Sequence, residues 1–225
     1  MCGRFTLAKK SAEVAARFHI VIPEDSRVTT YNAAPSQVLP VITSRDPGRL
    51  SLARWGLPAP WKKESQQLVI NARTETLQQK KLFRPLLEQG RCLVPADGFY
   101  EWDKQGSKRQ PLRFRLAGDE LFAFAGLYQL TTDGSGNGMV AFTILTTAAN
   151  ELVRPVHDRM PVILLPEAED AWLSAAAWED SLESLLQPYP AGAMQAYTVS
   201  PSVNRTGVDH EGLIAPWEDP ALKLF

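Results

Sequence analysis

The chain has 225 residues, 44% of them hydrophobic, and its 24 basic side chains nearly balance 25 acidic ones. This size and composition predict a globular protein with one core and a single domain over residues 1–225. The near-zero net charge excludes broad attraction to a polyanion, so any nucleic-acid site must be a local patch. Residues 1–10 lack the apolar run of a signal peptide, and no stretch reaches the ~18 apolar residues of a membrane span. We therefore expect a cytoplasmic protein without a membrane partner.

Taken in chain order, the predicted elements alternate irregularly between helices and strands. Periodic apolar residues predict helices at 9–18, 75–90, 166–176 and 181–187, with Pro85 kinking the second and Gly90 ending it. Runs rich in β-branched and aromatic residues predict strands at 37–43, 50–57, 67–74, 91–102, 111–117, 121–130, 139–147 and 160–165. The glycine-rich stretch 131–138 is typical of a hairpin loop. Without a regular βαβ rhythm, the pattern favours an α+β domain with a curved, barrel-like mixed β-sheet flanked by short helices.

The cysteine and histidine counts are low. Two cysteines do not form a disulfide framework, and three scattered histidines show no metal-ligand spacing, so we expect no metal and no cofactor. Cys92 lies within an apolar strand and is predicted to be core.

Cys2 raises a chemical question because removal of Met1 would leave it as the N-terminal residue. It would then carry an amine and a thiol on adjacent carbons, with reference pKa values of roughly 7.7 to 8.0 and 8.5. No internal cysteine offers that pair. The alternative is that Cys2 is an unremarkable residue of a disordered terminus.

Four further segments are polar where their neighbours are apolar: 31–35, 71–74, 97–102 and 157–161. Asn32 and Asp97 could be turn residues, Glu101 an edge-strand charge, and His157 a capping or ion-paired loop residue. Read together with Cys2, however, the glutamate, histidine and amides form a coherent acid/base set around a nucleophile.

Asn71 and Arg73 occupy alternate positions at the end of an apolar strand. Alternate side chains of a strand project from the same face. We therefore expect these two side chains to point in one direction.

Seven motifs occur in an order and at a spacing that resemble the SRAP (SOS response-associated peptidase) family along the whole chain. They are MCGRF, YNAAP, RWGLPAPW, INARTET, CLVPADGFYEW, ILTTAAN and HDRMPVIL. The resemblance implies a protein that reacts covalently with abasic sites in single-stranded DNA and shields them during replication.

The resemblance also implies roles for particular residues. Cys2 would be the covalent nucleophile once Met1 is gone, and would form a thiazolidine with the sugar aldehyde. His157 would assist opening of the sugar, Glu101 would act as general acid/base and in reversal, and Asn32 would hold the reacting centre by hydrogen bonds. DNA contacts would come from Arg4, Asn71, Arg73, Thr146 and Arg159, and from a stacking or wedging surface of Trp55, Gly56, Leu57 and Trp102. Trp55 and Trp102 could instead be core residues.

Two other functions remain open at this point. One is a cysteine peptidase in the manner of N-terminal nucleophile hydrolases, which could remove Met1 or cut other peptides. The other is a non-covalent single-strand binder in which Cys2 is incidental. In each DNA-linked case we expect a monomer.

Overall fold

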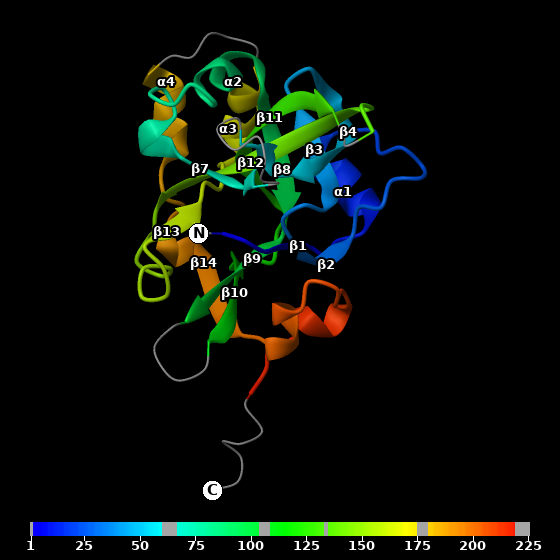
Figure 1. Ribbon diagram of the computed structural model, residues 1–225. Helices are drawn as coiled ribbons and strands as arrows, with labels where there is room; N and C mark the ends of the chain where they lie inside the picture. The colour runs from blue at the N-terminus through cyan, green and yellow to red at the C-terminus, as the bar shows by residue number, and fades with distance from the viewer. Residues whose placement is uncertain (1, 60–66, 104–108, 133–134, 175–179, 219–225) are drawn as a thin grey trace, which may run out of the picture.

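The computed structural model describes residues 2–59, 67–103, 109–132, 135–174 and 180–218. Two β-structures meet in it, a closed barrel and a second sheet. In Figure 1 the barrel strands lie in the upper half and the second sheet in the lower half. None of the helices in the described ranges is long and apolar enough to cross a membrane.

Five strands close the barrel. They are paired in the ring order β11 (Phe122–Thr132), β8 (Arg91–Ala96), β3 (Val38–Thr43), β4 (Asp46–Trp55) and β12 (Gly138–Ala148). The ring closes because β12 pairs with β4 in parallel and with β11 antiparallel. Closure satisfies the main-chain hydrogen-bonding groups that open edges would leave unpaired. Two short strands, β7 (Asn71–Arg73) and β13 (Arg159–Pro161), extend the barrel from the far end of β12.

The second sheet has the order β14 (Met194–Thr198), β10 (Gln110–Leu116), β9 (Gly98–Asp103), β1 (Phe5–Leu7) and β2 (Thr30–Ala33). The chain passes from β8 to β9 through Asp97, which is buried. The Asp97 carboxylate accepts hydrogen bonds from Thr6 Oγ1 at 2.5 Å and Ala8 N at 2.6 Å, and pairs with Arg113 at 3.0 Å. These bonds hold the chain, where it passes from the barrel to the second sheet, beside strand β1.

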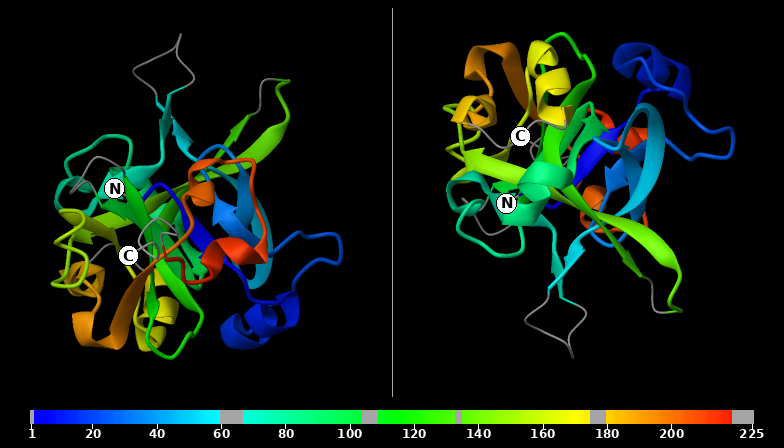
Figure 2. Two further views of the ribbon diagram at one scale, coloured as in Figure 1. Left: turned by 90° about the horizontal axis from the view of Figure 1, so that it is seen from below. Right: turned by 90° about the horizontal axis from the view of Figure 1, so that it is seen from above.

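The remaining elements are short. The helices are α1 (Ser11–Phe18), α2 (Arg84–Gln89), α3 (Pro166–Leu173) and α4 (Asp180–Glu183). A small hairpin pairs β5 (Leu57–Pro58) with β6 (Leu68–Val69), and single 3-10 turns occur at η1 (Thr74–Thr76), η2 (Ser184–Leu186), η3 (Ala191–Ala193), η4 (Pro201–Asn204) and η5 (Glu211–Ile214). Figure 2 shows the helices around the periphery of the strands.

The predicted fold class is confirmed, since a barrel-like mixed β-structure with few short helices is what the structure contains. The predicted helices at 9–18 and 181–187 correspond to α1 and to α4 with η2. The helix predicted at 166–176 corresponds to α3, although its residues 175–176 lie outside the described ranges, as do 133–134 of the hairpin loop.

Three local predictions are wrong. The strand predicted at 91–102 is two strands in different sheets, because Asp97 turns the chain there. The strand predicted at 67–74 is likewise two short strands, β6 and β7. The helix predicted at 75–90 exists only as η1 and α2, because Pro85 occupies the first turn of α2 and so starts a helix where a kink was expected.

Three strands of the second sheet, β1, β2 and β14, were not predicted. They are 3 to 5 residues long and carry no apolar alternation that exceeds the background.

The barrel core is aromatic. The Trp55 ring centroid lies 5.2 Å from that of Phe5 and 6.2 Å from that of Phe142, onto which it stacks. Both cysteines, Cys2 and Cys92, belong to the same cluster of packed side chains. The start of the chain is therefore built into the core beside the second sheet.

Candidate active site at the start of the chain

Cys2 is completely buried. Its thiol lies 3.6 Å from the carbonyl oxygen of Arg4, to which it donates, and its own carbonyl oxygen accepts a hydrogen bond of 2.8 Å from Asn71 Nδ2. The disordered-terminus alternative for Cys2 is thus wrong. Met1 lies outside the described residues.

Glu101 on β9 is a charged group that acts on Cys2. Its side chain is almost fully buried, with 4% of the residue exposed. Burial raises the pKa of the Cys2 thiol well above its usual range, and the negative charge of Glu101 raises it further. A buried carboxylate and a buried thiol therefore share one environment, and the thiol is held in its protonated form.

Asn71 and Arg73 lie on β7 on either side of Ala72, which is buried. Asn71 reaches Cys2, whereas Arg73 is exposed. The neighbouring strand β12 places Thr146 opposite Arg73, and β13 places Pro161 on the other side of Thr146. Four predicted residues, Asn71, Arg73, Thr146 and Arg159, thus lie on three adjacent strands.

His157 precedes β13, and its side chain is 15% exposed. Its Nδ1 accepts a hydrogen bond of 3.0 Å from the backbone N–H of Arg159 and lies 2.9 Å from Asp158 Oδ1. These two contacts hold the ring in place at Nδ1.

Arg159 is nearly buried, and its guanidinium is engaged by protein groups. It forms a bidentate ion pair with Glu75, at 2.5 and 2.9 Å, and it also donates to the carbonyl oxygen of Thr146. The Arg159 guanidinium holds the pKa of the Glu75 carboxyl below its usual range. As a DNA contact, Arg159 is partly neutralised by this partner.

Arg4 and Asn32 are joined to each other. Arg4 Nη1 donates to Asn32 Oδ1 at 2.7 Å and to the carbonyl oxygen of Val203 at 2.6 Å. The structure therefore brings both predicted residues together, against the segment after β14.

The predicted stacking surface is mostly interior. Trp55 and Leu57 are completely buried, and Trp55 Nε1 donates to the carbonyl oxygen of Ile70 at 2.9 Å. The core alternative thus describes Trp55. Gly56 is also buried, with φ of +123° and no room for a side chain, since a Cβ there would lie 2.6 Å from the Cβ of Leu68. Trp102 is half-buried and donates from Nε1 to Asn204 Oδ1 at 2.6 Å.

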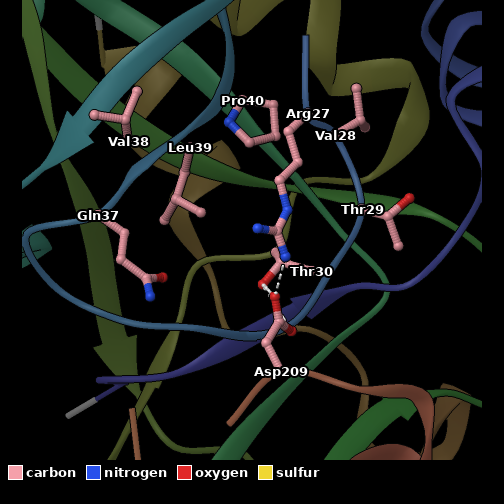
Figure 3. A pocket seen from close by; sticks show the side chains of 9 residues that line it. All are labelled: Arg27, Val28, Thr29, Thr30, Gln37, Val38, Leu39, Pro40 and Asp209. Carbon is pink, nitrogen blue, oxygen red and sulfur yellow. Dashed lines mark hydrogen bonds and ion pairs between the residues drawn. The ribbon is translucent and has the colours of Figure 1, made fainter. Parts of the chain in front are cut away.

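A pocket of about 250 Å³ lies away from Cys2, between the segment before β2 and strand β3 (Figure 3). Its lining includes Arg27, Thr30 and Asp209 but none of the predicted site residues. Among the residues that the structure describes, no group of three or more His, Cys, Asp or Glu side chains could hold a metal ion.

The sequence analysis missed the segment that follows β14. Val203, Asn204, Arg205 and Val208 contact predicted site residues through their backbone or side chains. No sequence signal marks this stretch, because carbonyl oxygens, which every residue carries, make most of the contacts.

This fold and site define a class of α+β barrel protein whose candidate nucleophile is the second residue of the chain. The family model described as SOS response associated peptidase (SRAP) matches residues 1–206, and the chain belongs to this family.

Named relatives and solved structures agree with this assignment. The chain is 46% identical to abasic site processing protein YoqW of Bacillus subtilis over 211 residues, covering 91% of this chain and 94% of YoqW. It is 34% identical to abasic site processing protein YedK of Escherichia coli, covering 77% and 79% of the two chains. A crystal structure of a protein from Bacteroides thetaiotaomicron superposes with a TM-score of 0.86 at 25% identity, covering 96% of this chain and all of that one.

Proposed function

We propose that this protein processes abasic sites in single-stranded DNA by forming a covalent bond through Cys2. Relatives whose matches cover 91% and 77% of the chain are named abasic site processing proteins. The observation that carries the proposal is the buried Cys2 thiol beside the buried Glu101 carboxylate, with the Cys2 backbone held by Asn71.

The reaction requires the α-amine of Cys2, and hence prior removal of Met1. An abasic deoxyribose opens to an aldehyde at C1′. The amine adds to this carbon and water leaves, which gives a Schiff base. The thiol then adds across the C=N bond, with sulfur bound to carbon and its proton transferred to nitrogen, and a five-membered thiazolidine results. Ring closure is intramolecular and gains an effective concentration of ~10⁵ M or more in favourable cases.

Two side chains supply the proton transfers in this proposal. Glu101 lies close enough to Cys2 to raise the pKa of its thiol, so it is placed to give a proton to the departing water and recover it from the nitrogen as the Schiff base forms, and later to carry the thiol proton to the Schiff-base nitrogen. His157, whose Nδ1 faces both a donor and a carboxylate, would assist opening of the sugar ring. The same groups would serve reversal of the linkage, a lyase-like step.

DNA would run over the strand ends of β7, β12 and β13. Arg73 is exposed there and would contact a phosphate, with Thr146, Asn71 and Arg159 beside it. Few phosphate contacts suit the near-zero net charge. We expect the protein to act as a monomer. We also expect it to bind single-stranded DNA, because an unpaired strand lets the sugar reach a buried nucleophile.

A second candidate function is peptide cleavage by Cys2, supported by the description of the family as a peptidase. In its narrowest form, Cys2 would assist the removal of Met1. This function requires a peptide cleft and an oxyanion hole around Cys2.

One assay separates the two functions. Purified protein is incubated with a single-stranded oligonucleotide carrying one abasic site, and separately with a peptide library. Covalent processing predicts a species of reduced mobility on a denaturing gel and no turnover of the library. Peptide turnover without a DNA adduct would contradict the proposal and favour the peptidase.

A further inference from the structure

Arg4 carries a group of hydrogen bonds that tie the start of the chain to the segment after β14. Its Nη1 uses both hydrogens, one for Asn32 Oδ1 at 2.7 Å and one for the Val203 carbonyl at 2.6 Å. Its Nη2 donates to the carbonyl oxygen of Asn204 at 3.3 Å. A phosphate could bind Nη1 only after one of its two bonds had broken.

Asn32 uses its whole amide in the same group. While Oδ1 accepts from Arg4, Nδ2 lies within hydrogen-bonding distance of three carbonyl oxygens, those of Val203 at 3.3 Å, Arg205 at 3.1 Å and Val208 at 2.8 Å. Only 1% of the residue is exposed. The Nδ2 hydrogens are taken up by these carbonyls and the residue is buried, so this amide offers no donor to a DNA substrate, in contrast to the role that the resemblance implied.

The far end of the same segment is anchored by Asp209. Its carboxylate accepts from the backbone N–H of Tyr31 at 2.6 Å and pairs with Arg27 at 2.7 Å. Figure 3 shows Asp209 below Thr30 and Arg27, at the edge of the pocket. Residues 203–209 are therefore held against β2 at both ends. We call Arg4, Asn32 and this segment the C-terminal clamp.

The clamp is directly connected to the proposed reacting groups. The carbonyl oxygen of Arg4 accepts from the Cys2 thiol and, at 3.0 Å, from the backbone N–H of Tyr100, the residue before Glu101. On the other side of Glu101, Trp102 donates to the Asn204 side chain. The clamp thus fixes the backbone at Arg4, Tyr100 and Trp102, which surround Cys2 and Glu101.

We infer that Arg4 and Asn32 are positioning residues, which act through the clamp to hold Cys2 in register with Glu101, and that neither contacts DNA phosphate nor the reacting sugar. This inference rests on the proposed function. The family model matches residues 1–206. Part of the clamp, including Val208 and Asp209, therefore lies outside the matched residues.

The test separates the rate of the chemical step from DNA affinity. Affinity is measured with an oligonucleotide carrying tetrahydrofuran, an abasic analogue without an aldehyde, over a range of salt concentrations. The rate is measured as single-turnover formation of the covalent species at saturating abasic oligonucleotide. The variants are Arg4→Gln, Arg4→Lys and Asn204→Ala, with Arg45→Lys as a matched control on the exposed turn between β3 and β4.

The clamp predicts that both Arg4 variants lower the rate, by about 10- to 100-fold for a displacement near 1 Å. Neither changes the slope of log affinity against log salt. Asn204→Ala, a substitution on the surface with little risk to folding, lowers the rate less, and Arg45→Lys leaves it unchanged. For comparison, Arg73→Gln reduces the slope by about 0.7, the value for one phosphate contact in a single strand.

A phosphate contact gives the opposite pattern. If Arg4→Gln reduces the slope by about 0.7 and Arg4→Lys restores both slope and rate, the inference is wrong. It is also wrong if Asn204→Ala and both Arg4 variants react at the unaltered rate. If instead the unaltered protein forms no covalent species, the proposed function itself fails, and the two failures are distinguishable.

Discussion

The regions around the two cysteines are alike in burial and different in polarity. Both side chains are completely buried in one core cluster, and burial raises the pKa of both thiols. Cys92 lies on β8 across from Gly126 of β11, and burial alone accounts for its raised pKa. Around Cys2, by contrast, a carboxylate, a carbonyl oxygen and an amide lie within reach.

The comparison teaches that burial does not identify a reactive cysteine. A thiol in an apolar environment stays protonated and has no group to accept its proton. Beside Glu101 the Cys2 thiol is also protonated, yet a base stands next to it. From the sequence, the two cysteines differ in that Cys2 follows Met1 within the motif MCGRF, whereas Cys92 lies within an apolar strand.

The largest expected difference lies between Cys2→Ala and Cys92→Ala. The first removes the nucleophile and should abolish the covalent species, whereas the second should leave the reaction intact and only lower stability. The measurement is a denaturing gel with abasic oligonucleotide, together with chemical unfolding of each variant. A Cys2→Ala protein that still forms the covalent species, or a folded Cys92→Ala protein that does not, would contradict the assignment of Cys2 as the nucleophile and Cys92 as a core residue.

Glu101→Gln should make the Cys2 thiol more acidic and at the same time slow the crosslinking reaction. Because the negative charge of Glu101 raises the pKa of Cys2, its removal should lower that pKa and raise the thiolate fraction at any given pH. Iodoacetamide should then label Cys2 faster, while crosslinking slows by roughly 10²- to 10⁴-fold through loss of acid/base catalysis.

The Cys92 labelling rate serves as the internal control, since Glu101 contributes nothing to its raised pKa. Faster labelling of both cysteines in Glu101→Gln would indicate that the core has loosened. It would contradict the claim that the charge of Glu101 controls the acidity of Cys2.

Gly126→Ala examines the apolar region. A Cβ at Gly126 would lie 2.8 Å from Cys92 Sγ and 3.1 Å from the carbonyl oxygen of Thr143. Overpacking of this kind lowers the free energy of unfolding by about 1–3 kcal/mol. Combining it with Cys92→Ala should recover part of the loss.

Gly138→Ala, where no atom lies within 4 Å of the added carbon, is the matched control for that unfolding experiment. Equal destabilisation at Gly126 and Gly138 would mean that contact with Cys92 is not the cause.

The smallest expected effect concerns Glu75, which neutralises Arg159. Glu75→Gln should free the guanidinium, strengthen non-covalent binding of single-stranded DNA and steepen its salt dependence by at most about 0.7. In the unaltered protein, protonation of Glu75 should have the same effect as pH falls through its lowered pKa. Anisotropy titrations at several pH values would show this step, and the Gln variant should lack it.

The ion pair between Glu75 and Arg159 also makes the stability of the fold depend on pH. A carboxyl whose pKa is lowered in the folded state contributes stability above its ordinary pKa, and this is lost as pH falls through the lowered value. Glu75→Gln should therefore be slightly less stable than the unaltered chain near neutrality and should differ less from it in acid.

Much of the fold was readable from local sequence. Long strands such as β11 and β12 follow from β-branched and aromatic runs, and α1 from its periodicity. The break between β8 and β9 could not be predicted, because it depends on bonds from Asp97 to Thr6 and Ala8, about 90 residues earlier in the chain.

The candidate site was readable only in part. Cys2 and Glu101 are chemically distinctive residues, and the structure brings their environments together. The clamp could not be predicted from the sequence, because its acceptors are backbone carbonyls whose positions depend on tertiary structure alone. For the same reason, Arg4 and Asn32 resemble substrate contacts in the sequence and are scaffold contacts in the structure.

The central claim is that Cys2 forms the bond to DNA through both its amine and its thiol. Intact mass of the complex with an abasic oligonucleotide tests it directly. The account predicts the mass of the protein without Met1 plus that of the oligonucleotide less one water, with the modification mapped to Cys2. An adduct that retains Met1, that maps elsewhere, or that still forms in Cys2→Ala would contradict it.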